Sequence, residues 1–188
     1  GAEFNKYFTE AKGTKTFVNM DASVYDTLSL MEGIIKKTVS QTAGITKYLE
    51  SISVTDQDFF RNLFNFLYNH IQYEMDTQGI EQLRQPIRTW FDRKADCDCF
   101  SIFISSVLHN YKGGIKHSLR VIKMKGQSSF HHVYVVIPKI NKATETLSRK
   151  DYYVIDPVLD RFDQEAEFII EKHDKTLSGK SGVSGVSG

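Results

Sequence analysis

A change of hydrophobic periodicity at Gly113-Gly114 divides the chain into a helix-forming part and a strand-forming part. Before the two glycines, Asp96 can cap a helix whose apolar residues fall on one stripe, and the glycines end that helix. After them come three runs rich in β-branched and aromatic residues, at 115–124, 130–137 and 152–155, which predict strands. The stripe consists of Phe100, Phe103, Ile104, Val107, Leu108 and Tyr111. We therefore expect an α+β fold in which helices pack on a small antiparallel sheet.

Helical spacing of apolar residues also predicts helices upstream of this point. Residues 22–50 have the pattern of one or two helices, interrupted near Gly44. A further helix is expected from Thr55 or Asp56 to Gly79, and it should be central because it is apolar around much of its girth. Residues 80–93 are predicted to form a connector that brings Trp90 near a functional site.

The length and composition favour one domain with one core, because a chain of 188 residues, of which 40% are hydrophobic, can bury a single hydrophobic core. We place this domain at 5–177, with a helical part at 20–94 and a core part at 95–163. Residues 1–4 are typical of a remnant of cloning. Residues 178–188 are a Gly/Ser/Val tail that is expected to be a flexible linker, through which the domain could join a larger assembly.

The charge and hydropathy exclude several classes of partner. A formal net charge of +1, without a long basic block, argues against nucleic-acid binding. No apolar run reaches the roughly 20 residues of a membrane span, and the N-terminus lacks the pattern of a signal peptide. We therefore expect a soluble protein and leave its compartment open. The two cysteines are separated by one residue, so free thiols are expected.

Three residues in chain order have the chemistry of cysteine-dependent acyl transfer. Cys97 lies in the first helical turn, where free N–H groups and the helix dipole favour a thiolate, although acidic neighbours oppose it. Helix geometry turns this sulfur toward the predicted sheet. Strand alternation puts His132 on one face and His131 on the other, so only one imidazole can face the thiol. Asp156, at the end of the next strand, can reach the far ring nitrogen of His132 and hold it as a general base. Asp160 and Asp163 are alternatives to Asp156 if the strand register differs.

The segments Asp-Cys-Asp-Cys-Phe-Ser, His-Val-Tyr-Val and Val-Ile-Asp-Pro resemble the three motif blocks of the transglutaminase-like superfamily, which has a papain-like fold. The resemblance covers roughly 82–160 and implies Cys97 as nucleophile, His132 as base and Asp156 as orienting residue. It also implies a protein or peptide substrate and no cofactor. Ala95 stands where that family usually has glycine. Members of the superfamily include cross-linkers, hydrolases and inactive binding relatives, so the resemblance leaves the reaction open.

The second donor for a developing oxyanion, besides the Cys97 backbone N–H, has three candidates: Gln85, Gln82 and the indole N–H of Trp90. Two other classes of function compete with the enzyme. One is an inactive structural or interaction module of a larger protein. The other is a zinc site built from Cys97, Cys99, His131 and His132, which the one-residue spacing of the cysteines disfavours. No metal is therefore expected, and the chain has no loop with calcium-ligand spacing.

Overall fold

A computed structural model describes residues 1–9, 15–19, 23–76 and 80–178. The helices are α1 (Val24–Lys37), α2 (Ala43–Ser51), α3 (Asp56–His70), α4 (Pro86–Asp92) and α5 (Cys97–Asn110), with 3₁₀ turns at Ala2–Tyr7, Val39–Thr42, Tyr111–Gly113, Thr144–Thr146 and Arg149–Asp151. The strands are β1 (Lys15–Asn19), β2 (Gln72–Tyr73), β3 (Ile80–Arg84), β4 (Lys94–Ala95), β5 (His117–Met124), β6 (His132–Pro138), β7 (Tyr152–Ile155) and β8 (Ile169–Leu177). The tail at 179–188 lies outside the described residues.

The main sheet has four strands in the order β7-β6-β5-β8, and all its neighbours are antiparallel. The predicted α+β class, with helices on a small antiparallel sheet, is confirmed, and the arrangement is compatible with a papain-like fold. The three predicted strands are β5, β6 and β7. Strand β8 was not predicted, because charged residues such as Glu171 and Lys172 interrupt its apolar pattern at this edge of the sheet.

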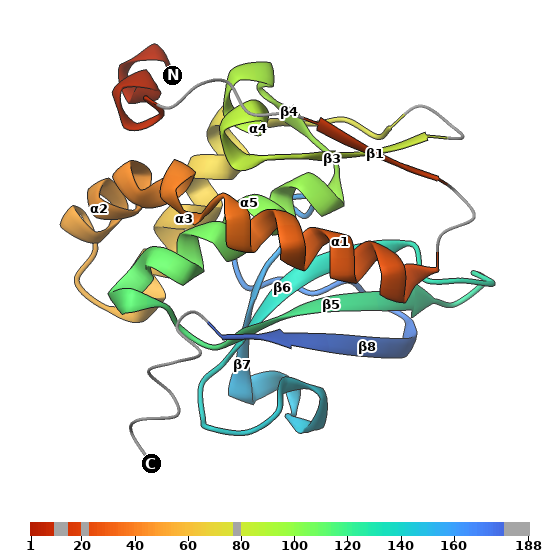
Figure 1. The fold of residues 1–188 in the computed structure, drawn as a ribbon. Helices are drawn as coiled ribbons and strands as arrows, with labels where there is room; N and C mark the ends of the chain where they lie inside the picture. Colours follow the sequence, from red (N-terminus) through yellow and green to blue (C-terminus); the bar gives the residue numbers. More distant parts are fainter. Residues whose placement is uncertain (10–14, 20–22, 77–79, 179–188) are drawn as a thin grey trace.

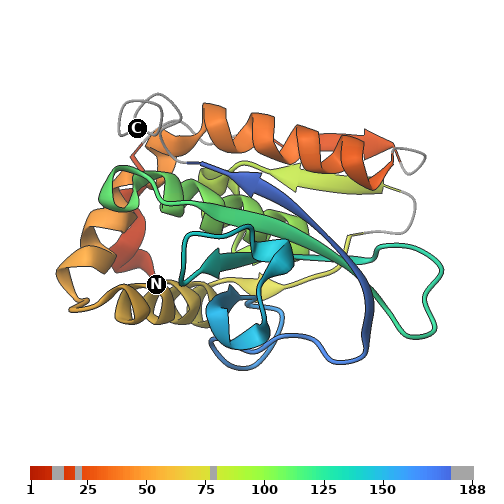
Figure 2. The ribbon, with the colours of Figure 1, turned by 90° about the horizontal axis from the view of Figure 1, so that it is seen from below.

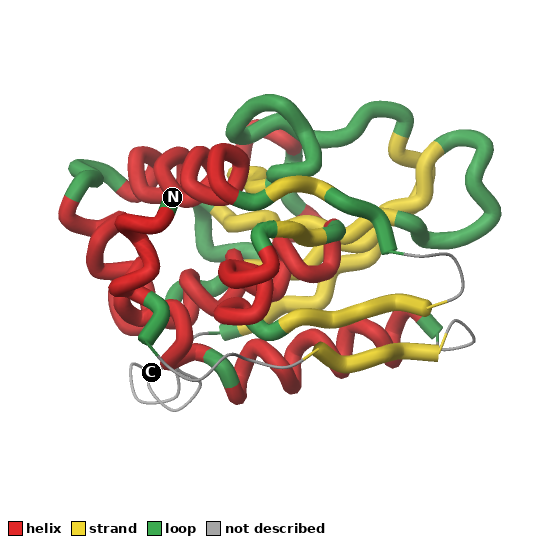
Figure 3. Tube along the Cα trace, turned by 90° about the horizontal axis from the view of Figure 1, so that it is seen from above, coloured by secondary structure: helices red, strands yellow, loops and turns green. Residues whose placement is uncertain are grey.

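Helix α5 is the central helix of the fold, and α1, α2, α4 and β6 all pack against it (Figure 1). Its residues from Asp98 to His109 are all buried. The prediction that the helix after Thr55 would be central is therefore wrong, since α3 lies beside α2 and β7 instead. Seen from above, the helices gather mainly at one end of the molecule and the strands at the other (Figure 3).

The sheet separates two hydrophobic clusters, because successive side chains of a strand point to opposite faces. Val133, Val135 and Ile155 belong to the main core on the face of α5. Tyr134 and Val154 belong to a smaller cluster on the other face. Loops between the strands cover that second face, as the view from below shows (Figure 2). The buried Arg120 also lies on this face, where it bonds Asp174, and it is discussed below.

Two predictions for residues 55–93 are wrong. The helix expected to reach Gly79 ends at His70. The expected connector at 80–93 contains β3, which pairs with β1, and helix α4. Pro86 begins α4 because its fixed φ suits the first helical position, where no hydrogen-bond donor is needed. Arg93 ends the helix in the left-handed conformation.

Residues near the N-terminus pack on the helical core. The ring of Phe4 contacts Tyr48 and Phe66, and Asn5 accepts a hydrogen bond from Trp90 at 2.9 Å. The cloning origin of residues 1–4, the single domain at 5–177 and the linker role of the tail stay predictions. None of the helices within the described residues has the length and apolar character needed to cross a membrane.

His117, at the start of β5, makes the fold sensitive to acid. Its ring is fully buried between the hydroxyl of Ser105 at 2.6 Å and the carbonyl of Ile115 at 2.9 Å, and burial lowers its pKa to about 3. The unfolded chain has an ordinary histidine pKa near 6.5 and therefore binds the proton first. The neutral His117 ring therefore contributes its full stability above about pH 6.5. This stability is lost as pH falls from 6.5 toward the folded pKa of about 3. We expect stability to fall by about 2 kcal/mol between about pH 8 and about pH 5 because of this residue alone.

The measurement is urea unfolding of the parent and of His117→Gln across that pH range. The variant should be less stable at high pH but should lose less stability on acidification. A matched control is His131→Gln, because His131 is exposed and its replacement should leave the pH dependence as in the parent. An identical pH dependence in parent and His117→Gln would contradict the prediction.

Candidate active site at the edge of the sheet

The site begins at the first turn of α5, where Asp96 is the N-cap, as predicted. Its Oδ1 accepts a hydrogen bond from the backbone N–H of Cys99 at 3.0 Å. This cap fixes the start of the helix, so that Cys97 is the first helical residue. Cys97 is half-buried and carries a free thiol.

His132 and Asp156 are in direct contact. The Nε2 of His132 and the Oδ2 of Asp156 are 2.6 Å apart. The register pairs Val135 with Ile155, so Asp156, the residue after β7, follows opposite Tyr134 and reaches His132, which lies two positions away on the same face. The other carboxylate oxygen, Oδ1, accepts the backbone N–H of Val158 at 3.2 Å, which fixes the carboxylate. Asp156 is 2% exposed and His132 is 13% exposed, so the ring retains access to solvent.

The thiol approaches β6 at the edge that β7 leaves free. Strand β7 ends at Ile155, which is paired with Val135, so Val133 has no strand partner on that side. Helix α5 fills this gap: the Ser101 hydroxyl donates to the Val133 carbonyl at 3.4 Å, and the Val133 N–H interacts with the Cys97 sulfur. The peptide that carries this N–H joins Val133 to His132.

The position of the thiol relative to the sheet differs from the prediction, because His132 does not lie on the face of the sheet that α5 covers. His132 has the same parity as Tyr134, whose ring it contacts at 5.4 Å, and Tyr134 lies on the face away from α5. A thiol directed at the centre of the sheet would therefore meet Val133 and Val135 rather than the imidazole. The early end of β7 opens an edge from which both faces can be reached. His131 is exposed and contacts Ser129, at 3.1 Å, rather than the site.

The electrostatic environment of Cys97 disfavours its thiolate. Burial raises the pKa of this thiol well above its ordinary value, and the carboxylates of Asp98, Asp96 and Asp156 act in the same direction. The Val133 N–H opposes them and lowers this pKa. The helix start was expected to lower the thiol pKa, and this expectation is wrong because burial and three carboxylates outweigh the free N–H groups.

Two carboxyl pairs surround this first turn. Burial, followed by a hydrogen bond to Asp76, raises the pKa of Asp96 to about 7. Burial and a hydrogen bond to Glu81 raise the pKa of Asp98 well above its ordinary value. Each carboxyl–carboxyl hydrogen bond needs a shared proton. The first turn therefore carries less negative charge near neutral pH than its two aspartates suggest.

Of the three predicted oxyanion donors, the indole N–H of Trp90 is already engaged. Trp90 is fully buried, stacks on Phe66 and donates its indole N–H to Asn5, so it has no donor left for a substrate. Its place near the site stays a prediction. The side-chain oxygen of Gln85, the N-cap of α4, accepts from Gln41 at 2.8 Å. The side-chain oxygen of Gln82, on β3, accepts from Arg84 at 3.4 Å. Because these bonds use acceptor atoms, the assignment of Gln85 or Gln82 as oxyanion donor stays a prediction.

Cys99 occupies a different environment from Cys97. It is buried, its thiol donates to the Gln82 carbonyl at 3.3 Å, and it lies 3.8 Å from Arg84 Nη1. In the part of the chain that the structure describes, no three His, Cys, Asp or Glu residues are grouped as metal ligands would be. The described residues thus give the zinc alternative no support.

Tyr73 is a neighbour of the site that sequence reasoning missed. Strand β2 runs parallel to β4 and pairs Tyr73 with Ala95, two positions before Cys97. Burial raises the pKa of its phenol, and the nearby Cys97, Asp96 and Asp156 raise it further. The side chain is 43% exposed, so it lies at the solvent side of the site. No local pattern marks it, since a two-residue parallel pair has no sequence signature.

Comparison with known proteins gives a distant structural likeness. No protein-family model matches the chain, and no curated protein matches it. A solved structure of a candidate cysteine protease from Cytophaga hutchinsonii is similar with a TM-score of 0.36 and 9% sequence identity. The match covers 95% of this chain and 56% of that protein, so the chain spans little more than half of its length.

Proposed function

We propose that the protein is a thiol-dependent enzyme that transfers or hydrolyses acyl groups, with Cys97 as nucleophile, His132 as base and Asp156 as orienting residue. The observation that carries the proposal is the hydrogen bond of 2.6 Å between His132 and the buried Asp156. It lies one peptide away from the N–H that interacts with the Cys97 sulfur. A base oriented by a third group, beside a thiol, is the arrangement that nucleophilic catalysis needs.

In the proposed reaction, Cys97 attacks the carbonyl carbon of a peptide or glutamine-type amide. The S–C bond forms while the thiol proton passes to Nδ1 of His132, because Asp156 holds Nε2. The imidazolium returns this proton to the departing amine as the C–N bond breaks. Water or a second amine then attacks the thioester, and the thiol recovers its proton. The raised pKa of Cys97 makes proton removal by His132 part of the attack rather than a step before it.

The experiment is a mass-spectrometric search for an acyl adduct on Cys97 after incubation with a library of glutamine-containing peptides. We expect a thioester on Cys97, with release of ammonia or amine. Hydroxylamine should remove the adduct, because it cleaves thioesters. Cys97→Ala should give neither adduct nor amine.

The matched control is Cys99→Ala, which removes the other thiol of the same helix. This variant should still acylate Cys97, because Cys99 faces β3. An adduct on Cys99 alone, or amine release that persists in Cys97→Ala, contradicts the proposed nucleophile.

A second candidate function is a non-catalytic transglutaminase-like module of a larger protein. The observation that favours it is the raised pKa of Cys97, which opposes the reactive thiolate. The same peptide experiment separates the two candidates. A module without turnover should give no adduct and no amine from the parent protein, while its thermal stability matches that of Cys97→Ala.

A further inference from the structure

Strand β8 forms one edge of the main sheet, and in the part of the chain that the structure describes no strand pairs with its outer side. It spans Ile169–Leu177 and is the longest strand of that sheet. Figure 1 shows it as the outermost strand, with α1 running above it. Asp174, near its middle, is partly exposed although its side chain is only 2% exposed, so the exposed atoms there belong to the main chain. Main-chain groups at such an edge can pair with a further strand.

The charges of β8 match those of a second, antiparallel copy of the same strand. In a pair centred on His173, Glu171 of each copy lies opposite Lys175 of the other copy. The same register puts Lys172 opposite Asp174, on the other face of the sheet. Opposite charges that face each other across two strands stabilise the pair.

The neighbouring symmetric registers do not have this match. A pair centred one residue earlier puts Lys172 opposite the same lysine of the second copy. A pair centred one residue later puts Asp174 opposite the same aspartate. Like charges directly opposite each other destabilise two paired strands, so the sequence of β8 favours the register centred on His173.

Both side chains of the Glu171–Lys175 pair are accessible. Glu171 is 51% exposed and Lys175 is 29% exposed. Each has a partner within its own chain, Lys123 at 2.7 Å and Glu32 at 3.9 Å. These contacts leave capacity for a second partner, because a carboxylate can accept several hydrogen bonds and an ammonium can donate three.

Helix α1 brings an exposed aromatic side chain to the middle of the same edge. Tyr25 is 55% exposed, and its ring centre lies 5.0 Å from that of His173. His173 is the central residue of the favoured register, so the Tyr25 rings of two paired copies lie on either side of the twofold axis. Burial of exposed aromatic surface there adds an apolar contribution to the charge pairs.

We infer that two copies of this chain associate through β8 as an antiparallel, twofold-symmetric dimer. The pairing joins two four-stranded sheets into one continuous sheet. Glu171 and Lys175 form two equivalent ion pairs across the junction. The inference does not depend on the proposed thiol chemistry, since Cys97, His132 and Asp156 lie on other elements.

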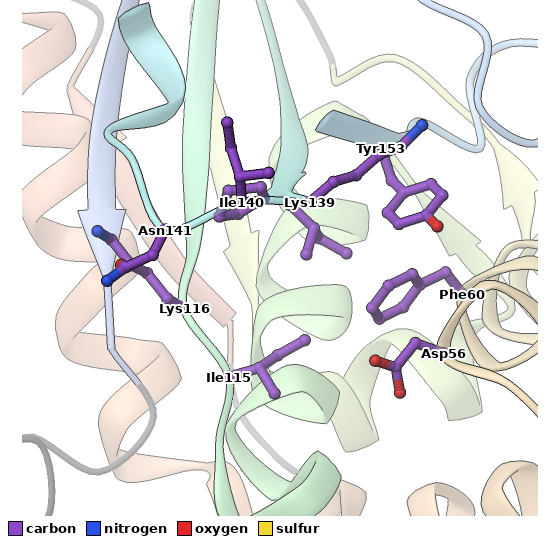
Figure 4. Close-up of a pocket in the computed structure, with 10 residues that line it drawn as sticks. Asp56, Phe60, Ile115, Lys116, Lys139, Ile140, Asn141 and Tyr153 are labelled. Carbon is purple, nitrogen blue, oxygen red and sulfur yellow. The ribbon is translucent and has the colours of Figure 1, made fainter. Parts of the chain in front are cut away.

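The cavity of about 400 Å³ beside Lys116 is a separate surface, because none of its lining residues belongs to β8 or α1. The nitrogens of Lys116 and Lys139 turn away from the space beside the Phe60 and Tyr153 rings, and the Asp56 carboxylate lies next to these rings (Figure 4). The dimer leaves this cavity unchanged.

The test is sedimentation velocity of the parent protein between about 1 and about 100 µM. We expect the parent to form a dimer in this range. Lys175→Glu puts like charges opposite Glu171 at two symmetric positions and should weaken dimerisation at least about tenfold. Glu171→Lys should have the same effect. The double variant, which exchanges the two charges, should dimerise more tightly than either single variant, because opposite charges face each other again.

The matched control is Lys150→Glu, which reverses an exposed charge just before β7, at the opposite edge of the sheet. It should dimerise as the parent does, and circular dichroism should show that all variants are folded. Three outcomes overturn the inference: a parent that stays monomeric up to about 100 µM, equal dimerisation of the parent and Lys175→Glu, or a double variant that dimerises no better than the single variants.

Discussion

Replacing Asp156 with asparagine is expected to lower the rate of acyl transfer by about 10⁴-fold, the loss typical of an orienting carboxylate in such a triad. Asparagine can keep its carbonyl on the Val158 N–H, which Oδ1 now accepts. Its amide group then faces Nε2 of His132 and forces that nitrogen to accept. The ring proton moves to Nδ1, which can no longer take the proton of the thiol. The measurement is the single-turnover rate of acyl-adduct formation on Cys97.

The control for this prediction is Asp160→Asn, four residues further along the same loop. Asp160 is exposed, and its carboxylate lies 3.5 Å from the Tyr68 hydroxyl, away from His132. This variant should retain the parent rate. Thermal unfolding should show that both variants are folded. If both variants lose the rate equally, or if neither does, Asp156 is not the orienting residue.

The largest expected effect on stability is at Arg120, whose replacement by methionine should destabilise the fold by about 3–5 kcal/mol. Arg120 is fully buried, and it binds Asp174 at 2.8 Å and Glu165 at 3.0 Å. Although burial alone lowers its pKa, the hydrogen bonds to Asp174 raise the pKa above its ordinary value. Methionine would fill much of the space, but it would leave the buried Asp174 without its cation and Glu165 with Arg149, at 3.5 Å, as its remaining ion-pair partner among the described residues. Urea unfolding measures the change.

Two further variants separate this effect from simple packing. Lys123 lies on β5, as Arg120 does, and Lys123→Met removes a partly exposed ion pair with Glu171 of β8. This variant should change stability by less than about 1 kcal/mol. Adding Glu165→Gln and Asp174→Asn to Arg120→Met should restore part of the loss, because the uncompensated charges are then gone. A triple variant no more stable than Arg120→Met would show that packing, and not charge, explains the loss.

Local patterns predicted the parts of the fold that depend on neighbouring residues. The capped helix at Cys97, the start of a helix at Thr55 or Asp56 and three of the four strands of the main sheet could be inferred from spacing and residue type. Strand β8 could not, because an edge strand with one exposed face needs few apolar residues. The helix α4 was missed because a seven-residue helix that begins with proline resembles a turn.

For the candidate site, the sequence determined the chemical types and their order, since Cys97, His132 and Asp156 stand in motif blocks that can be recognised one by one. It also determined that His132 shares a face of its strand with Tyr134 and not with His131, because strand alternation is a local property, but it did not determine which of the two faces meets α5. Only the tertiary structure decided that the thiol meets β6 at its edge, since this depends on where β7 ends relative to α5. The same holds for the raised pKa of Cys97 and for the cavity beside Lys116. The burial and the charges around Cys97 and around this cavity come from segments that are far apart in the chain. No local sequence pattern encodes how close these segments lie in the fold.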